Sequence, residues 1–220
     1  NRQIFDWFSK QQSYIHPHTY FYPSKIGDLE RFQMVHKKGC RLDPEICSVA
    51  AQNGHLNILG YLHENGCPWN QNTCEVAARN GHLKVVKFLY EKGCLWDYWT
   101  CAMAAENGHL EILRYVHEKG CPWEPVTCSY AARNGHIECL QYAYENGCPR
   151  DYWTCYYAAE YGHIECLIYA HENGFPRNEE TCRLAAKNGQ LECLIYLHET
   201  GCHWDEWTCE AAALGGHPNC

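Results

Sequence analysis

The 220-residue sequence predicts an all-α solenoid built from stacked helix-turn-helix repeats. Three observations support this fold class: glycine recurs every 27 residues, cysteine recurs in the same register, and each repeat contains two segments with helical spacing of apolar residues. The glycines of this ladder are Gly27, Gly54, Gly81, Gly108, Gly135, Gly162, Gly189 and Gly216. A register kept without an insertion identifies the repeat as the structural unit.

The repeat follows the consensus D-x-x-T-C-x-x-A-A-x-N-G-H-L-E-x-L-x-Y-L-H-E-N-G-C-P-W, with six complete 27-residue units over residues 43–204. We expect a repeat domain over residues 27–220, with its last unit truncated. Residues 1–26 are expected to form a degenerate N-terminal capping segment, because Pro23 would interrupt a full first helix.

The first helix of each unit is expected to begin after an acid or amide residue, and six of these seven residues are favoured N-caps. They are Asp43, Asn70, Asp97, Glu124, Asp151, Asn178 and Asp205. The Asn-Gly pair then ends the helix, because glycine tolerates the left-handed cap. The residue before the N-cap, often Trp, is spaced from the Thr-Cys cysteine as in a hydrophobic staple.

The second helix carries apolar residues at helical spacing, as in Leu110, Leu113 and Val116. A Gly-Cys pair closes it, and the cysteine is expected to contact the helix one turn back, as Cys67 would contact Leu62. Paired alanines should let neighbouring first helices approach closely. We expect the first helices to be shorter than the second ones.

The run Asn107–Glu111, the paired alanines Ala104-Ala105 and Gly120 resemble the ankyrin repeat. The Gly-Cys-Pro-Trp and Thr-Cys signatures resemble the short ankyrin-like variant of large DNA viruses of protists and of some algae. The resemblance covers residues 27–217 and implies protein–protein recognition without catalysis. Because an ordinary ankyrin repeat has about 33 residues, we expect this shorter unit to lack long β-hairpin fingers.

The function that follows is a non-catalytic protein–protein interaction scaffold, which binds a protein partner through the concave face of the stack. Two alternatives remain: a structural subunit built permanently into a larger assembly, and a substrate adaptor of a ubiquitin ligase. The adaptor alternative comes from the resemblance, because some similar proteins carry an upstream F-box. No F-box is identifiable in residues 1–26.

Composition excludes several other classes of function. A net charge of −8 argues against nucleic acid as the main partner, because phosphate binding needs a basic surface. No apolar run of about 18 residues is present, so we expect no membrane partner. The sequence predicts no cofactor and no small-molecule substrate.

The 17 cysteines raise the questions of metal and disulfides. Equivalent cysteines of neighbouring repeats should lie about 8–10 Å apart, the distance between packed helices. That distance is too long for a shared zinc ion or a disulfide. A pair within one loop, such as Cys67 with Cys74, is not excluded by distance. Phe175 replaces one ladder cysteine and can pack but not cross-link, which favours buried free thiols and a cytoplasmic location (host cytoplasm, if the source is viral).

The histidines of the Gly-His pairs are expected to tie one repeat to the next by hydrogen bonds, since Asp28 and Gln190 replace them in two copies. A second series should be exposed near the end of the second helix, where a cationic imidazole suits the helix dipole. This series comprises His63, His117, His171 and His198. Neither series points to a catalytic site.

The candidate partner-binding residues are aromatic residues at variable positions of the first helices, because aromatic side chains are enriched in binding hot spots. They are Tyr98, Trp99, Tyr152, Trp153, Tyr156 and Trp207. The alternative for the tryptophans is that their rings cover the neighbouring repeat.

Overall fold

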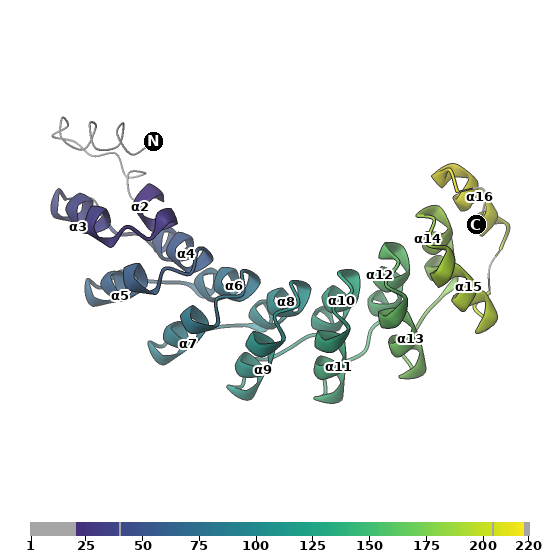
Figure 1. Cartoon of the computed structure of the whole chain (residues 1–220). Helices are drawn as coiled ribbons and strands as arrows, with labels where there is room; N and C mark the ends of the chain where they lie inside the picture. Colours follow the sequence, from purple (N-terminus) through teal and green to yellow (C-terminus); the bar gives the residue numbers. More distant parts are fainter. Residues whose placement is uncertain (1–20, 40, 204, 218–220) are drawn as a thin grey trace. The chain divides into compact units, whose positions relative to one another are not determined.

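The computed structural model describes residues 21–39, 41–203 and 205–217. The chain divides into two compact units, Asn1–Trp96 (unit 1) and Asp97–Cys220 (unit 2). Each unit is a stack of helical hairpins in which first and second helices alternate along the chain (Figure 1). The predicted capping segment over residues 1–26 lies mostly outside the described residues, as do Cys40 and Trp204.

The described residues form fifteen helices and no strand, which makes the fold an all-α helical-repeat solenoid. Unit 1 contains α2 (Phe21–Ile26), α3 (Leu29–Lys37), α4 (Pro44–Gln52), α5 (Leu56–Glu64), α6 (Gln71–Arg79) and α7 (Leu83–Glu91). Unit 2 contains α8 (Tyr98–Glu106), α9 (Leu110–Glu118), α10 (Val126–Arg133), α11 (Ile137–Glu145), α12 (Trp153–Tyr161), α13 (Ile164–Glu172), α14 (Glu179–Lys187), α15 (Leu191–Glu199) and α16 (Glu206–Gly215).

The expectation of shorter first helices was wrong. Both helices of a typical repeat have nine residues, as in α6 and α7. The two helices have the same length because each ends at an Asn-Gly pair, or a close variant of it, about the same number of residues after its start. In the second helices this end is a Schellman turn: Gly66 has φ +71°, and the Cys67 amide donates to the Leu62 carbonyl at 2.9 Å. This contact confirms the predicted approach of Cys67 to Leu62.

The first helices start as predicted at five of the seven caps, where the side-chain oxygen accepts a backbone N–H. These caps are Asp43, Asn70, Asp97, Asn178 and Asp205. Asp151 also accepts from Thr154, although α12 begins only at Trp153.

Glu124 is the exception, because the start of α10 has no side-chain cap. The Thr127 amide donates instead to the Glu124 backbone carbonyl at 2.9 Å. The buried Thr127 hydroxyl has no hydrogen-bond partner among the described residues, whereas Thr154 Oγ1 donates to Asp151 at 2.9 Å.

Small residues make the interior of the first-helix row. The paired alanines are completely buried or nearly so, as at Ala77, Ala78, Ala131 and Ala132. Adjacent first helices within each unit share far more close approaches than adjacent second helices do. The interior of each second helix is instead filled by larger residues such as Leu113 and Leu140, which are fully buried. Close packing at the first helices therefore leaves their outer positions as the variable surface.

Candidate functional site

The thiols are mostly interior groups: fourteen of the fifteen described cysteines are buried, and Cys209 is exposed. Their closest approaches join a Thr-Cys cysteine to the Gly-Cys cysteine 20 residues later. The Sγ–Sγ distance is 3.4 Å for Cys47–Cys67 and 3.0 Å for Cys74–Cys94. We missed this pairing because the distance argument compared only equivalent positions of neighbouring repeats and pairs within one loop.

The Gly-His histidines hold neighbouring repeats together, as predicted. His55 Nε2 lies 2.9 Å from the Lys25 carbonyl, and His82 Nε2 lies 3.0 Å from the Gln52 carbonyl. Gln190 makes the equivalent bond to Glu160 at 3.5 Å, which explains how an amide can replace the imidazole. The rings of His55 and His82 also lie directly against Gly27 and Gly54 of the preceding repeat, so these histidines are structural.

The second histidine series was predicted to be exposed and cationic, and this is wrong for two members. His117 and His171 are half-buried, and burial lowers the pKa of both imidazoles. Their Nδ1 atoms lie 3.2 Å and 2.8 Å from the hydroxyls of Tyr142 and Tyr196. The next repeat's tyrosine therefore shields the imidazole from solvent. His63 and His198 are exposed, as predicted.

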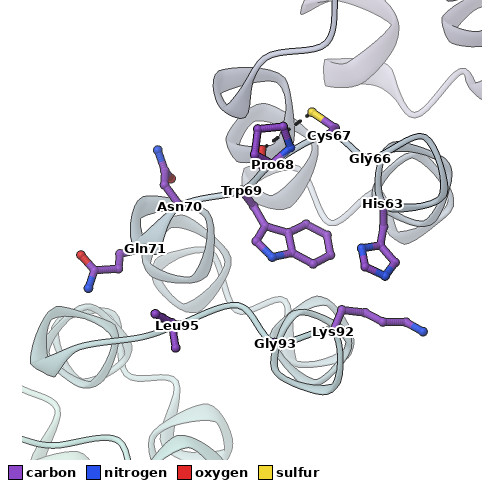
Figure 2. Close-up of a pocket in the computed structure, with 10 residues that line it drawn as sticks. All are labelled: His63, Gly66, Cys67, Pro68, Trp69, Asn70, Gln71, Lys92, Gly93 and Leu95. Carbon is purple, nitrogen blue, oxygen red and sulfur yellow. Dashed lines mark hydrogen bonds between the residues drawn. The ribbon is translucent and has the colours of Figure 1, made fainter.

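The tryptophans of the Gly-Cys-Pro-Trp loops stack on the end of the preceding second helix. Trp69 lies parallel to the His63 ring at 4.8 Å, and Trp123 lies parallel to His117 at 3.7 Å. Figure 2 shows the Trp69 indole directed toward His63 beside a surface cavity of about 650 Å³ in unit 1. This ring contact supports the loop, while the predicted hydrophobic staple to the Thr-Cys cysteine stays a prediction.

All six candidate partner-binding residues belong to unit 2. Tyr98 and Trp99 lie at the start of α8 with ring centroids 5.1 Å apart. At the start of α12, the ring centroid of Trp153 lies 4.4 Å from that of Tyr152 and 4.9 Å from that of Tyr156. Tyr152 remains 40% exposed and Trp153 38% exposed, so these rings contact one another without being buried.

Helix α10 connects these two groups through residues that our sequence analysis did not select. The ring centroids of Tyr130 and Trp99 lie 6.1 Å apart. The Arg133 guanidinium lies 5.7 Å from the Tyr157 ring centroid and 5.3 Å from that of Tyr161. Tyr157 also stacks on Trp153 at 5.5 Å. We call the connected set the aromatic face. It consists of Tyr98, Trp99, Tyr130, Tyr152, Trp153, Tyr156, Tyr157 and Tyr161.

The missed residues had a usable signal. Trp153, Tyr157 and Tyr161 lie four residues apart, so they share one face of a helix. A comparison of equivalent positions between repeats does not reveal this spacing, because it runs along the single helix α12.

Comparison with known proteins bears on the family. The family model for ankyrin repeats in three copies matches residues 47–125 and 76–153. The fold is similar to the crystal structure of the human ASB11 ankyrin repeat domain, with a TM-score of 0.60 and 20% sequence identity over 71% of this chain and 84% of that chain. Residues 47–153 contain ankyrin repeats. No curated protein matches the sequence.

Ankyrin repeats are generally protein–protein interaction modules and are typically non-catalytic. In the part of the chain that the structure describes, no three His, Cys, Asp or Glu side chains gather as a metal site would require. None of the described helices has the length and apolar character needed to cross a membrane.

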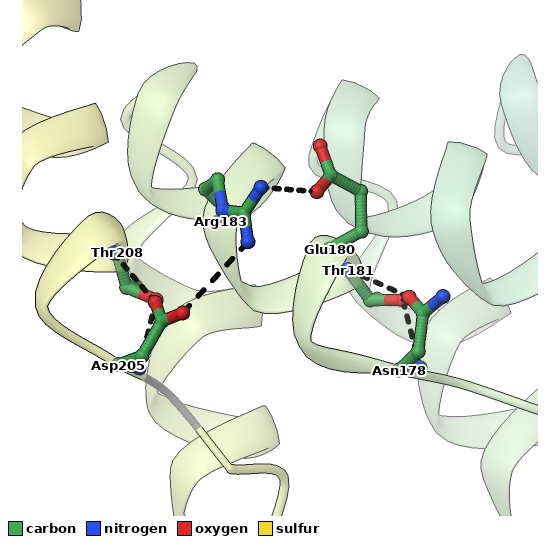
Figure 3. A network of polar contacts seen from close by, with 6 residues as sticks. All are labelled: Asn178, Glu180, Thr181, Arg183, Asp205 and Thr208. Atoms are coloured by element: carbon green, nitrogen blue, oxygen red, sulfur yellow. Dashed lines mark hydrogen bonds and ion pairs between the residues drawn. The ribbon is translucent and has the colours of Figure 1, made fainter.

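Trp207 lies apart from the aromatic face, on α16, the last described helix. It is 55% exposed and lines a groove of about 340 Å³ between α14 and α16, with Leu184, Ala211 and Leu214. Beside this groove, Arg183 lies between Glu180 at 2.6 Å and Asp205 at 3.8 Å, next to the capping boxes of both helices (Figure 3). The first-helix row of unit 2 thus combines exposed aromatic rings with charged side chains.

Proposed function

We propose that this protein is a non-catalytic scaffold whose protein partner binds the first-helix row of unit 2, the side expected to be concave. The single observation that carries the proposal is the aromatic face, in which Tyr152 and Trp153 are 40% and 38% exposed although they lie beside other rings. Large rings that stay accessible while held in place by neighbours lose little side-chain entropy on binding. No repeat-packing role accounts for their exposed area.

The charge of the same surface favours a basic partner segment. The first helices of unit 2 carry six acidic residues against three basic ones. Two of the basic residues are engaged within the surface, Arg133 over tyrosine rings and Arg183 beside Glu180. A partner with lysine or arginine next to apolar side chains would complement both properties, because arginine and lysine also bind aromatic faces.

The test compares partner capture by the wild-type chain, the double variant Trp99→Ala/Trp153→Ala, and the matched control Ile195→Ala. Ile195 is 47% exposed on α15, in the second-helix row of the same unit. Proteins captured by the wild type and the control but lost by the double variant are identified, and their affinity is then measured. We expect a loss of about 30-fold or more, the size of a hot-spot effect.

Circular dichroism decides whether this result reports recognition. The double variant should keep the helical spectrum and unfolding temperature of the control. If its helical signal is lost, the rings stabilise the repeats and the proposal fails. Equal capture by the double variant and the control would place the partner elsewhere.

One observation favours the alternative of a structural subunit. Leu214 of α16 is 79% exposed next to the exposed Trp207, which is a large apolar area for a free surface. If a permanent neighbour normally covers this groove, the isolated chain should aggregate. A recognition module should instead remain monomeric in light scattering. For location, we propose the cytoplasm, because its reducing conditions keep buried thiols free.

A further inference from the structure

The sulfur atoms of Cys182 and Cys202 lie 2.7 Å apart, closer than the 3.0 Å of Cys74–Cys94 and the 3.4 Å of Cys47–Cys67. Cys182 lies in the first turn and a half of α14, and Cys202 lies in the segment after α15. A disulfide bond requires the two sulfur atoms to approach to about 2.05 Å, a small further movement. This pair therefore needs little rearrangement to become covalently linked.

Solvent reaches one thiol of this pair and not the other. Cys182 is completely buried, but Cys202 is 9% exposed, the highest value among the buried cysteines. Cys202 also lines a surface cavity of about 230 Å³ together with His198, Gly201 and His203. A dissolved reagent can therefore react with Cys202, while Cys182 is reached only through Cys202.

The surroundings favour the thiolate form of Cys202. The pKa of Cys202 is lowered to about 7, chiefly because the Cys182 thiol donates a hydrogen bond to it. Burial opposes this shift, the nearby Arg177 adds to it, and Glu179 opposes it. Arg177 is held in place by two bonds of 2.6 Å to Thr200. The same hydrogen bond, together with burial, raises the pKa of Cys182, so the roles of the two sulfurs differ.

We propose that Cys182 and Cys202 form an oxidisable dithiol site that reacts with low-molecular-weight disulfides of the glutathione class. The Cys202 thiolate attacks one sulfur of glutathione disulfide, forming a mixed disulfide and releasing one glutathione thiolate. Cys182, as it gives up its proton, then attacks the Cys202 sulfur and releases the second glutathione. Two cysteine thiols are oxidised and one glutathione disulfide is reduced to two glutathione molecules.

The product closes a covalent loop from Cys182 in α14 to Cys202, just before the start of α16. It would stabilise the folded α14–α15 hairpin, because a cross-link removes conformations from the unfolded chain. The neighbouring repeat provides an internal comparison. Phe175 occupies the position equivalent to Cys202, so Cys155 has no partner thiol there, and its sulfur lies 3.8 Å from the Phe175 carbonyl. The site does not depend on the proposed binding function.

The experiment exposes the native full-length chain to glutathione disulfide near neutral pH, blocks the remaining thiols with N-ethylmaleimide, and maps cysteine-containing peptides by mass spectrometry over time. We expect the Cys182–Cys202 disulfide to form first, with thiol loss at Cys155 at least about tenfold slower. The oxidised chain should unfold several degrees higher than the reduced chain. This mapping needs no variant, so a folding defect cannot obscure it.

Three variants then assign the roles. Cys182→Ser should accumulate glutathione on Cys202, Cys202→Ser should leave Cys182 unmodified, and Cys155→Ser should oxidise at the wild-type rate. Uniform loss of all thiols would overturn the proposal. Modification of Cys182 in the Cys202→Ser chain at the same rate, or no disulfide between the two residues, would also overturn it.

Discussion

Helices α6 of unit 1 and α12 of unit 2 share their buried positions and differ at their exposed ones. The paired alanines of both helices are fully buried. At the outer positions, Gln71 and Asn72 of α6 correspond to Tyr152 and Trp153 at the start of α12, three repeats later. The comparison shows that packing fixes one set of positions, while the exposed set is free to acquire a recognition surface.

Charge differs in the same way. Unit 1 contains eight Asp and Glu residues against eleven Lys and Arg residues, and unit 2 contains eighteen against seven. The net charge of the whole chain, −8, therefore combines a slightly basic unit with a strongly acidic one. The acidic total therefore reflects the composition of unit 2 and not that of unit 1.

The largest effect should come from the glycines that both units share. Gly54 and Gly66 both have left-handed φ values, +75° and +71°. A methyl group at Gly54 would lie 2.8 Å from His82 Nδ1, whereas one at Gly66 would meet nothing within 4 Å. We expect Gly66→Ala to lower the free energy of unfolding by about 1–2 kcal/mol through backbone strain, and Gly54→Ala by about 2–4 kcal/mol because the His82 bond is also lost.

Urea unfolding of these variants measures the difference, and unit 2 offers the matched pair Gly135→Ala and Gly120→Ala. A methyl group at Gly135 would lie against His163, whereas one at Gly120 meets nothing within 4 Å. If the scaffold is the same in both units, the two differences should agree. Equal costs at all four glycines would mean that the histidine contact contributes nothing.

A smaller effect should distinguish two buried threonines. Thr73 Oγ1 in unit 1 donates to Asn70 at 3.2 Å, whereas Thr127 Oγ1 in unit 2 is buried without a partner among the described residues. Thr73→Val should lower the free energy of unfolding by about 1 kcal/mol, and Thr127→Val should leave it unchanged or raise it slightly. Thermal unfolding of both variants checks this, and destabilisation by Thr127→Val would contradict it.

Acid should weaken unit 2 through His117 and His171. Because burial lowers the pKa of both in the folded state, their neutral forms contribute stability above the unfolded pKa of about 6.5. This contribution is lost as the pH falls through that value toward the lower folded pKa. We expect the free energy of unfolding to decrease on acidification below about pH 6.5, and His117→Gln/His171→Gln to reduce the slope. Urea titrations across this range measure it, and an unchanged slope in the double variant would refute this origin.

The smallest effect is expected for the ion pair beside the α14–α16 groove. Arg183 and Glu180 are 2.6 Å apart, but their side chains are 35% and 41% exposed. Solvent screening limits such a pair, so Arg183→Ala should lower the free energy of unfolding by less than about 1 kcal/mol. Measurements at low and high salt should agree within that amount. A larger loss would show that the pair with Asp205 acts as part of the cap.

The repeat made most of the fold predictable, because Gly54, Asp43 and Ala77 each occupy a position whose role can be read from backbone chemistry. The Gly-His ties were predictable for the same reason, since Gln190 showed which chemistry was tolerated. The approach of Cys47 to Cys67 was not, because it depends on how a loop folds back over the start of a first helix. Such contacts between different positions of one repeat have no signature in the spacing alone.

The candidate site was predictable only as a set of variable aromatic positions. Trp153 and Tyr152 were selected from the sequence, and whether they bind a partner stays a prediction. Arg133 was not selected, because its role arises from a ring on the first helix of the next repeat, Tyr161, 28 residues away. The half-burial of His117 was hidden likewise, since the shielding Tyr142 belongs to the following repeat.

The placement of each Gly-His imidazole against the glycine of the preceding repeat constrains how such a gene can grow. His55 needs the bare backbone of Gly27, and His82 needs that of Gly54. Duplicating a whole 27-residue module preserves every junction, whereas copying a fraction of one would bring an imidazole against a residue with a side chain. Lengthening by entire modules is therefore the tolerated route, and designers could splice or exchange modules at these junctions without redesigning the seam.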